Sequence, residues 1–329
     1  MPAPYPWQEG AWARLTAQMQ QGRLPHGLLI SGRQGLGQLE LAQTMAAAAL
    51  CEDRAADGSA CGRCASCHLL AGGTHPDYKL VAPEEEGGAI RVDKIRDLGQ
   101  FTVLSRRHGA YKVGIVAPAD RLNLYAANGL LKTLEEPSPG VVLVLVSSQP
   151  ARLPGTIRSR CQMLRVPAPD GETAAAWLQA HCNRPDAARA LLAVHHGSPL
   201  LAKAAAEAEQ DRLRQALGRE LFRVAREQAD PVAVAEAWSD SDLALIVECL
   251  LAVCQDLIRG RLAGTTHMRE NPDMGEALAS LAPGCDVQRL FQLRDYLMQA
   301  MGWLGSSLNA RLMLEDLLLT WYQQVAARD

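Results

Sequence analysis

Glycines with the spacing of a phosphate-binding loop lie near the start of the chain. Gly32, Gly35 and Gly37 follow a short apolar run, and apolar residues at helical spacing continue from Leu39. A strand, a glycine loop and a helix in this order can present backbone N–H groups to a phosphate. The glycines read G-x-x-G-x-G, whereas a dinucleotide-binding loop reads G-x-G-x-x-G. We therefore predict the frame of a P-loop, with a simple tight turn as the alternative.

The side chains that ATP hydrolysis requires are absent from this loop. A working P-loop continues with Lys, which contacts the β- and γ-phosphates, and with Ser or Thr, which holds magnesium. Here Gln38 and Leu39 occupy the two positions, and Ala117-Pro118 stands where an Asp-Glu pair would follow a later apolar strand. We therefore predict a degenerate site with no catalytic residue of its own, and we expect no tight binding of ATP.

Four cysteines form a second cluster with chemical potential. Cys51, Cys61, Cys64 and Cys67 are spaced C-x9-C-x2-C-x2-C, which provides enough thiolates to surround one tetrahedral Zn²⁺ with no open position. The intervening residues 53–59 contain too few apolar side chains to fold alone, so a metal would fix them. We predict a structural zinc module.

Other interpretations of the cysteines remain. Cys64 to His68 matches the haem attachment pattern C-x-x-C-H, which belongs outside the cytoplasm. Four thiolates can also hold an iron–sulfur cluster, although the ferredoxin spacing C-x3-C-P is missing, and a redox pair would not need four cysteines. His75 or Asp77 could be a fifth ligand, but a hydrogen-bonded His in a turn fits better because four thiolates complete the shell.

Two arginines lie at a junction between a predicted helix and a strand. Arg158 and Arg160 come after the apolar run at 141–146, on a chain that does not use them on its own nucleotide. An arginine finger places its guanidinium on a γ-phosphate and can act on a neighbouring subunit. A surface salt bridge is the commoner role for such a residue.

The elements that position these residues indicate an α/β domain followed by helices. Apolar runs at 112–116 and 141–146 are typical of parallel strands covered on both faces, and residues 126–134 have helical spacing between them. Prolines and a glycine at 166–171 predict a boundary. After it, an apolar stripe from Leu290 to Leu308 recurs at steps of three and four.

Length and composition exclude several classes of protein. The chain has 329 residues, 48% of them hydrophobic and 21% charged, with a formal net charge of -3. It does not have the composition of a disordered tail or of a basic nucleic-acid coat. It shows neither a signal peptide nor an apolar run of membrane-spanning length, so we expect a cytoplasmic protein without disulfides and without membrane partners.

These residues resemble the delta-prime subunit family of bacterial DNA polymerase III clamp loaders, within the AAA+ proteins. The resemblance covers most of the chain. It rests on the loop at 32–39, the four cysteines, the sequence Asn-Gly-Leu-Leu-Lys-Thr-Leu-Glu-Glu-Pro at 128–137 and the motif Ser159-Arg160-Cys161. The Leu-Leu-Lys-Thr-Leu-Glu-Glu-Pro sequence is highly specific to clamp loader subunits.

The resemblance implies three domains. They are a RecA-like AAA+ domain at 1–166 with the zinc module inserted at 51–67, a helical lid at 167–207 and a helical collar at 208–329 that joins subunits into a ring. In the family, the arginine matching Arg160 completes the ATP site of the adjacent motor subunit. The lid arginine that follows Gly-Ser in motor subunits is absent here, because Pro199 follows Ser198.

The implied function is that of a non-hydrolysing member of a five-subunit spiral that places a sliding clamp on primed DNA. Its partners would be the motor ATPase subunits and the clamp-opening delta subunit, within a DNA-directed DNA polymerase holoenzyme. The clamp and the DNA would be contacted mainly through the complex.

Two other functions stay open from the sequence. One is an unorthodox nucleotide hydrolase that uses Asp120, Glu135 or Glu136. The other is a standalone zinc-dependent DNA-binding module, which the slightly acidic net charge disfavours.

Overall fold

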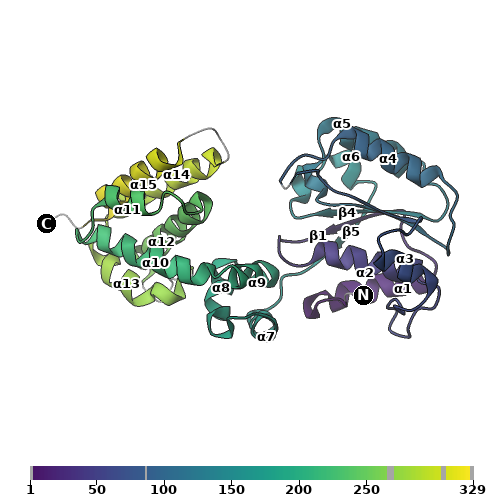
Figure 1. Cartoon of the computed structure of the whole chain (residues 1–329), viewed down its shortest axis with the longest axis horizontal. Helices are drawn as coiled ribbons and strands as arrows, with labels where there is room; N and C mark the ends of the chain where they lie inside the picture. The colour runs from purple at the N-terminus through teal and green to yellow at the C-terminus, as the bar shows by residue number, and fades with distance from the viewer. Residues whose placement is uncertain (1–2, 86, 265–269, 305–308, 327–329) are drawn as a thin grey trace. The chain divides into compact units, whose positions relative to one another are not determined.

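The computed structural model describes residues 3–85, 87–264, 270–304 and 309–326. The chain divides into two compact units, Met1–Thr173 and Ala174–Asp329. Figure 1 shows the sheet within the first unit and only helices in the second. The boundary at 207/208 lies inside the second unit and stays a prediction.

The first unit contains a parallel sheet of five strands in the order β2-β3-β4-β1-β5. The strands are β1 (Gly27–Ser31), β2 (Tyr78–Val81), β3 (Lys112–Val116), β4 (Val141–Ser147) and β5 (Gln162–Arg165). Both runs predicted as covered strands are strands, and every residue of β3 and β4 is buried. Their aliphatic composition follows from that burial on two faces.

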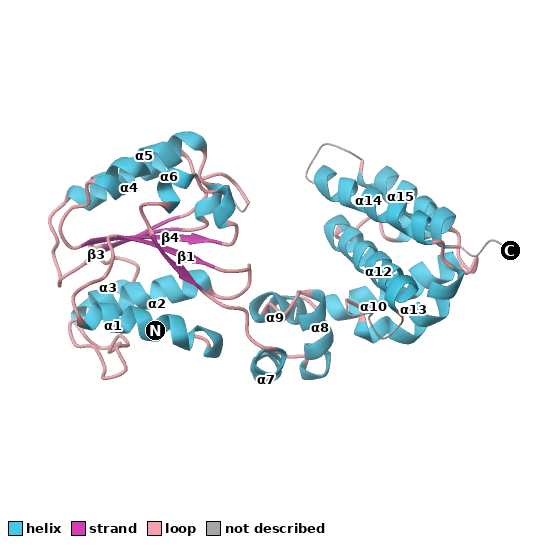
Figure 2. Cartoon of the chain, turned by 180° about the vertical axis from the view of Figure 1, so that it is seen from behind, coloured by secondary structure: helices cyan, strands magenta, loops and turns pink. Residues whose placement is uncertain are grey.

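Helices cover both faces of this sheet (Figure 2). One face carries α1 (Glu9–Gln20), α2 (Gln38–Leu50) and α3 (Ala65–Ala71), and the other carries α4 (Val92–Val103), α5 (Leu124–Glu135) and α6 (Gly155–Arg158). The helix predicted at 126–134 is most of α5. Its buried residues Ala126, Leu130 and Leu134 recur every four positions and face the core.

The common direction of the strands gives the sheet two distinct ends. At the amino end all five strands begin, and at the carboxyl end all five finish. In open parallel sheets, ligands bind outside the carboxyl ends of the strands. The two ends therefore serve as the reference for the sites described below.

The second unit is built from helices, and the described residues after β5 contain no strand. The helices are α7 (Gly171–His181), which begins at the boundary between the units, α8 (Ala188–Val194), α9 (Pro199–Glu207), α10 (Gln210–Ala225), α11 (Pro231–Ala237), α12 (Leu243–Ala263), α13 (Gly275–Leu281), α14 (Val287–Trp303) and α15 (Ala310–Val325). None of the described helices is both long enough and apolar enough to cross a membrane.

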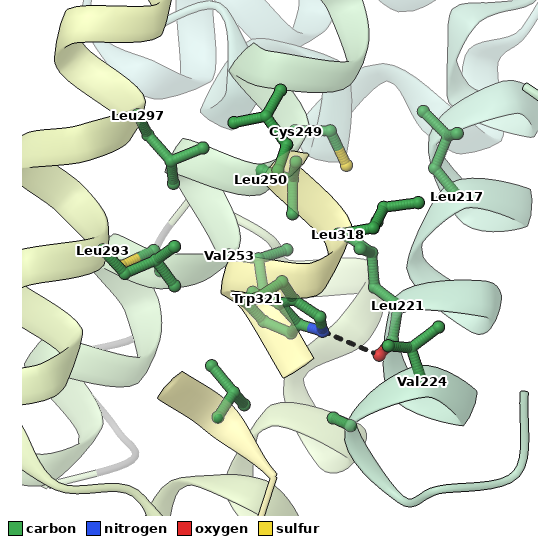
Figure 3. Close-up of a cluster of buried hydrophobic side chains, with 14 of the residues drawn as sticks. Leu217, Leu221, Val224, Cys249, Leu250, Val253, Leu293, Leu297, Leu318 and Trp321 are labelled. Atoms are coloured by element: carbon green, nitrogen blue, oxygen red, sulfur yellow. Dashed lines mark hydrogen bonds between the residues drawn. The ribbon is translucent and has the colours of Figure 1, made fainter. Parts of the chain in front are cut away.

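Two separate apolar clusters form the core of the helical unit. The smaller one lies among α7, α8 and α9, and the larger one joins α10 to α15. In the larger cluster Trp321 is fully buried, and its indole N–H donates to the carbonyl of Leu221 at 3.0 Å (Figure 3). In the predicted stripe, Leu290, Leu293 and Leu297 are buried residues of α14. Leu304 follows the last residue of α14, and Leu308 lies outside the described residues.

Candidate functional sites at the two ends of the sheet

The glycine loop lies at the carboxyl end of the sheet, directly after β1. Gly35 and Gly37 both have a φ of +78°, a backbone conformation that residues with a Cβ rarely adopt. Gly37 also lies at the start of α2, so the loop leads into a helix N-terminus. This geometry fits the predicted P-loop frame.

Gln38 folds into the loop that it follows. Its side-chain amide donates to the carbonyl of Arg33 at 2.5 Å, and a Cβ at Gly32 would lie only 2.8 Å from the same nitrogen. A neutral amide thus occupies the loop where a P-loop Lys would offer a positive charge to phosphate. Leu39 brings no hydroxyl for magnesium, and Glu40 adds a negative charge in the first turn of α2.

The first residues of the chain cover the same loop, which the sequence did not predict. The Trp7 indole donates to the carbonyl of Leu36 at 2.9 Å. The Gln8 amide donates to the carbonyls of Leu36 and Gly37 at 2.8 and 2.7 Å. A Cβ at Gly37 would lie 2.5 Å from the ring of Tyr5. The carbonyls of Leu36 and Gly37 are therefore satisfied within the chain.

The carboxylate that could replace the missing Asp-Glu pair is already bound. Asp120 follows β3 and lies at the carboxyl end, but it accepts from the Ser147 hydroxyl at 2.5 Å and from the Ser148 N–H at 3.1 Å. Glu135 and Glu136 lie where α5 ends, at the amino end of the sheet, whereas the glycine loop lies at the carboxyl end. The three carboxylates of the hydrolase alternative therefore do not converge on the glycine loop.

Arg160 lies in a turn whose neighbours are fastened to the core. Leu153 and Ile157 are buried, and Cys161 packs against the same cluster, so the chain contacts the core every four residues. Burial raises the pKa of the Cys161 thiol to about 11, which keeps it neutral. Ser159 closes the turn, because its hydroxyl donates to the carbonyl of Thr156 at 3.1 Å. Arg160 falls between these anchors and faces outward.

The Arg160 guanidinium makes two contacts within its own chain. One terminal nitrogen lies 2.7 Å from Glu135 Oε1, and the other donates to the Thr156 carbonyl at 3.0 Å. The Arg160 side chain is 37% exposed and that of Glu135 is 48% exposed. Both contacts leave part of the guanidinium open to solvent.

This arginine lies at the opposite end of the sheet from the glycine loop. A Cβ at Gly27, the first residue of β1, would lie 2.9 Å from the Arg160 carbonyl oxygen. The loop starts five residues later, which at about 3.3 Å per strand residue is about 16 Å away. Arg160 thus contacts Glu135 and Thr156 rather than the loop of its own chain.

The four cysteines converge at the amino end, just after α2. Their sulfur atoms all lie within 4.8 Å of one another, and Cys51 and Cys64 are 3.9 Å apart. A zinc ion with Zn–S bonds of 2.3 Å requires sulfurs about 3.8 Å apart. Backbone N–H groups of Cys61 and Cys67 donate to the sulfurs of Cys51 and Cys64 at 3.3 and 3.4 Å. The residues present therefore fit a tetrahedral metal ion.

The thiols of this cluster differ in pKa. The backbone N–H of Arg63 lowers the pKa of Cys61 to about 6. Burial raises the pKa of Cys51, and it raises that of Cys67 to about 12. A divalent cation would stabilise the thiolates that burial disfavours.

A hydrogen-bonded chain links the cysteine cluster to the sheet. The Ser66 hydroxyl donates to the Leu50 carbonyl at 2.6 Å and lies 2.8 Å from His75 Nε2. The other ring nitrogen of His75 accepts from the N–H of Asp77 at 3.0 Å. Both nitrogens are used, which confirms the interpretation of His75 as a hydrogen-bonded turn residue.

Asp77 forms a buried ion pair that the sequence did not predict. Its carboxylate lies 3.1 Å from the Lys112 ammonium, and the side chains are 0% and 2% exposed. Burial alone would raise the pKa of Asp77, but the N–H groups of His108 and Arg107 and the charge of Lys112 hold it below its ordinary value. Lys112 also lies 4.3 Å from the centre of the Phe101 ring. The sequence did contain a signal for this pair. Asp77 directly precedes β2, and Lys112 is the first residue of the adjacent strand β3.

Comparison with known proteins places both units in one family. The family described as "DNA polymerase III, delta subunit" matches residues 7–170, and "DNA polymerase III, delta subunit, C terminal" matches residues 208–323. The chain is 36% identical to the DNA polymerase III subunit delta' of Pseudomonas aeruginosa, over 96% of this chain and 97% of that protein.

Two further likenesses involve other subunits. The DNA polymerase III subunit tau of Escherichia coli is 31% identical over 50% of this chain and 25% of its own length. The structure of a DNA polymerase III gamma subunit-related protein of Thermotoga maritima has a TM-score of 0.49 and 18% identity, over 95% of this chain and 99% of that one. With two family matches and a full-length relative at 36% identity, the chain belongs to the delta' subunit family of DNA polymerase III.

Proposed function

We propose that this chain is a non-hydrolysing subunit of the DNA polymerase III clamp loader that supplies Arg160 to the ATP site of an adjacent motor subunit. The observation that supports this proposal most directly is the placement of Arg160 at the end of the sheet opposite its own glycine loop. A guanidinium so placed can serve only a nucleotide held by another chain.

The state of the chain's own loop supports the same proposal. A working motor needs a cation on the phosphates, a magnesium ligand and a carboxylate that acts on water. Here Gln38 fills the loop, Leu39 replaces the magnesium ligand, and Asp120 is held by two serines. A third part is also missing, because Ser198 is followed by Pro199 at the start of α9 and not by an arginine.

The half-exposed environment of Arg160 suits action on a partner. A finger must reach a phosphate outside its own chain, so it cannot be buried, yet it must be held in one orientation. The buried Ile157 and the packed Cys161 hold the turn, and the 37% exposed side chain leaves the guanidinium accessible. Surface arginines without such anchors would lose more conformational entropy on reaching a phosphate.

The helical unit has the role of assembly in this proposal. We infer that α7, α8 and α9 form the lid and that α10 to α15 form the collar, a division supported by their two separate cores. The partners are then motor ATPase subunits related to tau and a clamp-opening delta subunit. The sliding clamp and primed DNA are contacted through the complex, which works in the cytoplasm.

The four cysteines hold a structural Zn²⁺ in this proposal. Cys51, Cys61, Cys64 and Cys67 supply all four ligands, so the ion has no open position for a substrate. When bound, the ion supplies positive charge that stabilises the thiolates and fixes the polar segment 53–59. The chain itself contributes the backbone N–H donors to two of the sulfurs.

Replacing Arg160 with Ala tests the proposed function. We expect the R160A variant to fold and assemble normally, because a surface substitution changes stability by only about 0.5 kcal/mol. A finger supplies roughly 10³- to 10⁵-fold at one ATP site, so the DNA-stimulated ATPase of the reconstituted complex should fall clearly even though other sites remain. Replacing the exposed Arg158 in the same turn is the matched control. Unchanged turnover with R160A, in a complex of normal composition, would disprove the role.

A further inference from the structure

We propose that Glu135 is a positioning residue for Arg160, holding the guanidinium in the orientation in which it meets the partner's γ-phosphate. This inference rests on the proposed function of Arg160 and adds a second residue to it. Glu135 lies 2.7 Å from one terminal nitrogen of Arg160 and comes from a different helix, α5.

The geometry holds the guanidinium without using all of its donors. An arginine has five N–H groups in a rigid plane. Glu135 takes one terminal nitrogen and the Thr156 carbonyl takes the other, so the plane of the guanidinium is fixed at two points. Three N–H groups are left for a phosphate, which means that Arg160 can bind it without leaving Glu135.

The supports of this arrangement are rigid on both sides. Leu134, next to Glu135, is 2% exposed and packs into the core of the sheet face. A Cβ at Gly27 would lie 3.0 Å from the Leu134 side chain and 2.9 Å from the Arg160 carbonyl oxygen. Leu134 and Arg160 therefore both pack against Gly27, the first residue of β1. Because Gly27 lacks a side chain, α5 and the arginine turn come close enough for the ion pair.

The exposure of the pair argues for a role in orientation and not in stability. The side chains are 37% and 48% exposed, and ion pairs in such surroundings contribute little to folding. A residue that orients a catalytic group instead saves the entropy of ordering that group in the transition state. Its loss should therefore lower kcat for ATP and leave the KM close to its normal value, because the finger contacts charge that develops during the reaction.

The test compares two substitutions of Glu135 in the reconstituted clamp loader complex that contains the full chain. We expect E135A to lower kcat of the DNA-stimulated ATPase by about threefold to tenfold, with the KM for ATP within about twofold, since small misplacements of a catalytic group are costly. E135Q should restore kcat to near the unsubstituted value, because the amide oxygen still accepts from the guanidinium. Rescue by a neutral acceptor separates orientation from a general effect of charge.

Matched controls make the result specific. Glu136 is the next residue, is exposed, and forms no ion pair with another described residue, so E136A should leave kcat unchanged. In the double variant with R160A, E135A should cause no further loss, because its effect acts through Arg160. The thermal unfolding of E135A should match that of the unsubstituted chain.

The outcomes distinguish this inference from the proposed function. If R160A lowers turnover and E135A does not, the positioning role of Glu135 is disproved, while the proposed role of Arg160 is supported. A rise in kcat with E135A would also overturn the role, since it would mean that Glu135 holds the arginine back. If R160A itself has no effect, both proposals fail.

Discussion

The two ends of the parallel sheet are stabilised in different ways. At the carboxyl end the glycine loop is closed by neutral hydrogen bonds from Trp7, Gln8 and Gln38. At the amino end lie the cysteine cluster, the buried pair of Asp77 and Lys112, and the exposed Arg160. At the end where open sheets bind ligands, carbonyls of the loop are bonded within the chain, whereas the opposite end carries Arg160, whose charge is partly open to solvent.

In the proposed function, this difference separates a site that has lost its chemistry from one that acts on a neighbour. Loss of a Lys alone would leave an open loop that anions could still enter through its N–H groups. Here the side-chain amides of Gln38 and Gln8 also bond to carbonyls of the loop, so its conformation does not depend on one substitution. The variants below act on one end at a time and should leave the other unchanged.

The largest effect is expected from removing the metal from the amino end. The chain should hold one Zn²⁺, and C64S or a chelator should release it, because structural sites supply folding free energy through the metal. Residues 53–59 should then become sensitive to proteolysis while hydrogen exchange at the glycine loop stays the same. Elemental mass spectrometry gives the ion and its stoichiometry.

The control for the metal experiment is C182S, since Cys182 lies outside the cluster. It should retain the full zinc content. Two or more irons per chain would replace the zinc assignment with an iron–sulfur cluster. An equal loss of hydrogen-exchange protection at both ends would contradict the independence of the two ends.

The next effect concerns the buried ion pair. Replacing Lys112 with Met should lower the free energy of unfolding of the α/β unit by about 3–5 kcal/mol, because it leaves the Asp77 charge buried without its partner. Urea denaturation followed by circular dichroism measures this loss. R160A removes a cation from the exposed pair at the same end and should cost at most about 0.5 kcal/mol. Equal losses would show that burial does not distinguish the two pairs.

The smallest of the three effects is expected at the carboxyl end. Replacing Gly37 with Ala should cost about 1–3 kcal/mol, because its φ of +78° and the Tyr5 ring at 2.5 Å leave no room for a Cβ. Zinc content and the ATPase of the complex should remain normal. Gly10 is the control: it lies within α1 with nothing close to its Cβ position, so G10A should stabilise by about 0.5–1 kcal/mol. A G37A variant as stable as the original chain would contradict the tight closure of the loop.

The fold and the chemically distinctive residues followed from patterns local in the sequence. Continuous aliphatic runs predicted β3 and β4, and the spacing of four cysteines predicted their convergence. The outward position of Arg160 also has a local cause, because Leu153, Ile157 and Cys161 recur every four residues and turn inward. Such signals can be recognised because all of the residues involved lie within one short stretch of the sequence.

The pairings could not be predicted in the same way. Glu135 was a candidate for hydrolysis, and its contact with Arg160 arises only when α5 and α6 pack on one face of the sheet. The cover of Gln8 on the glycine loop joins residues 28 and 29 positions apart. Neither contact has a periodic pattern, since each depends on the tertiary arrangement and not on the local chain.

The closed loop has a consequence for how the subunit would behave through a reaction cycle. A ligand shifts a conformational equilibrium only as far as it binds one state more tightly than another. In the proposed function, the bonds from Gln38 and Gln8 to the loop carbonyls hold the loop in one conformation, so that nucleotide has no second state to select. In the proposed complex its shape would stay constant while its neighbours alternate, so the timing of each cycle would be set wholly by the partner that holds the ATP.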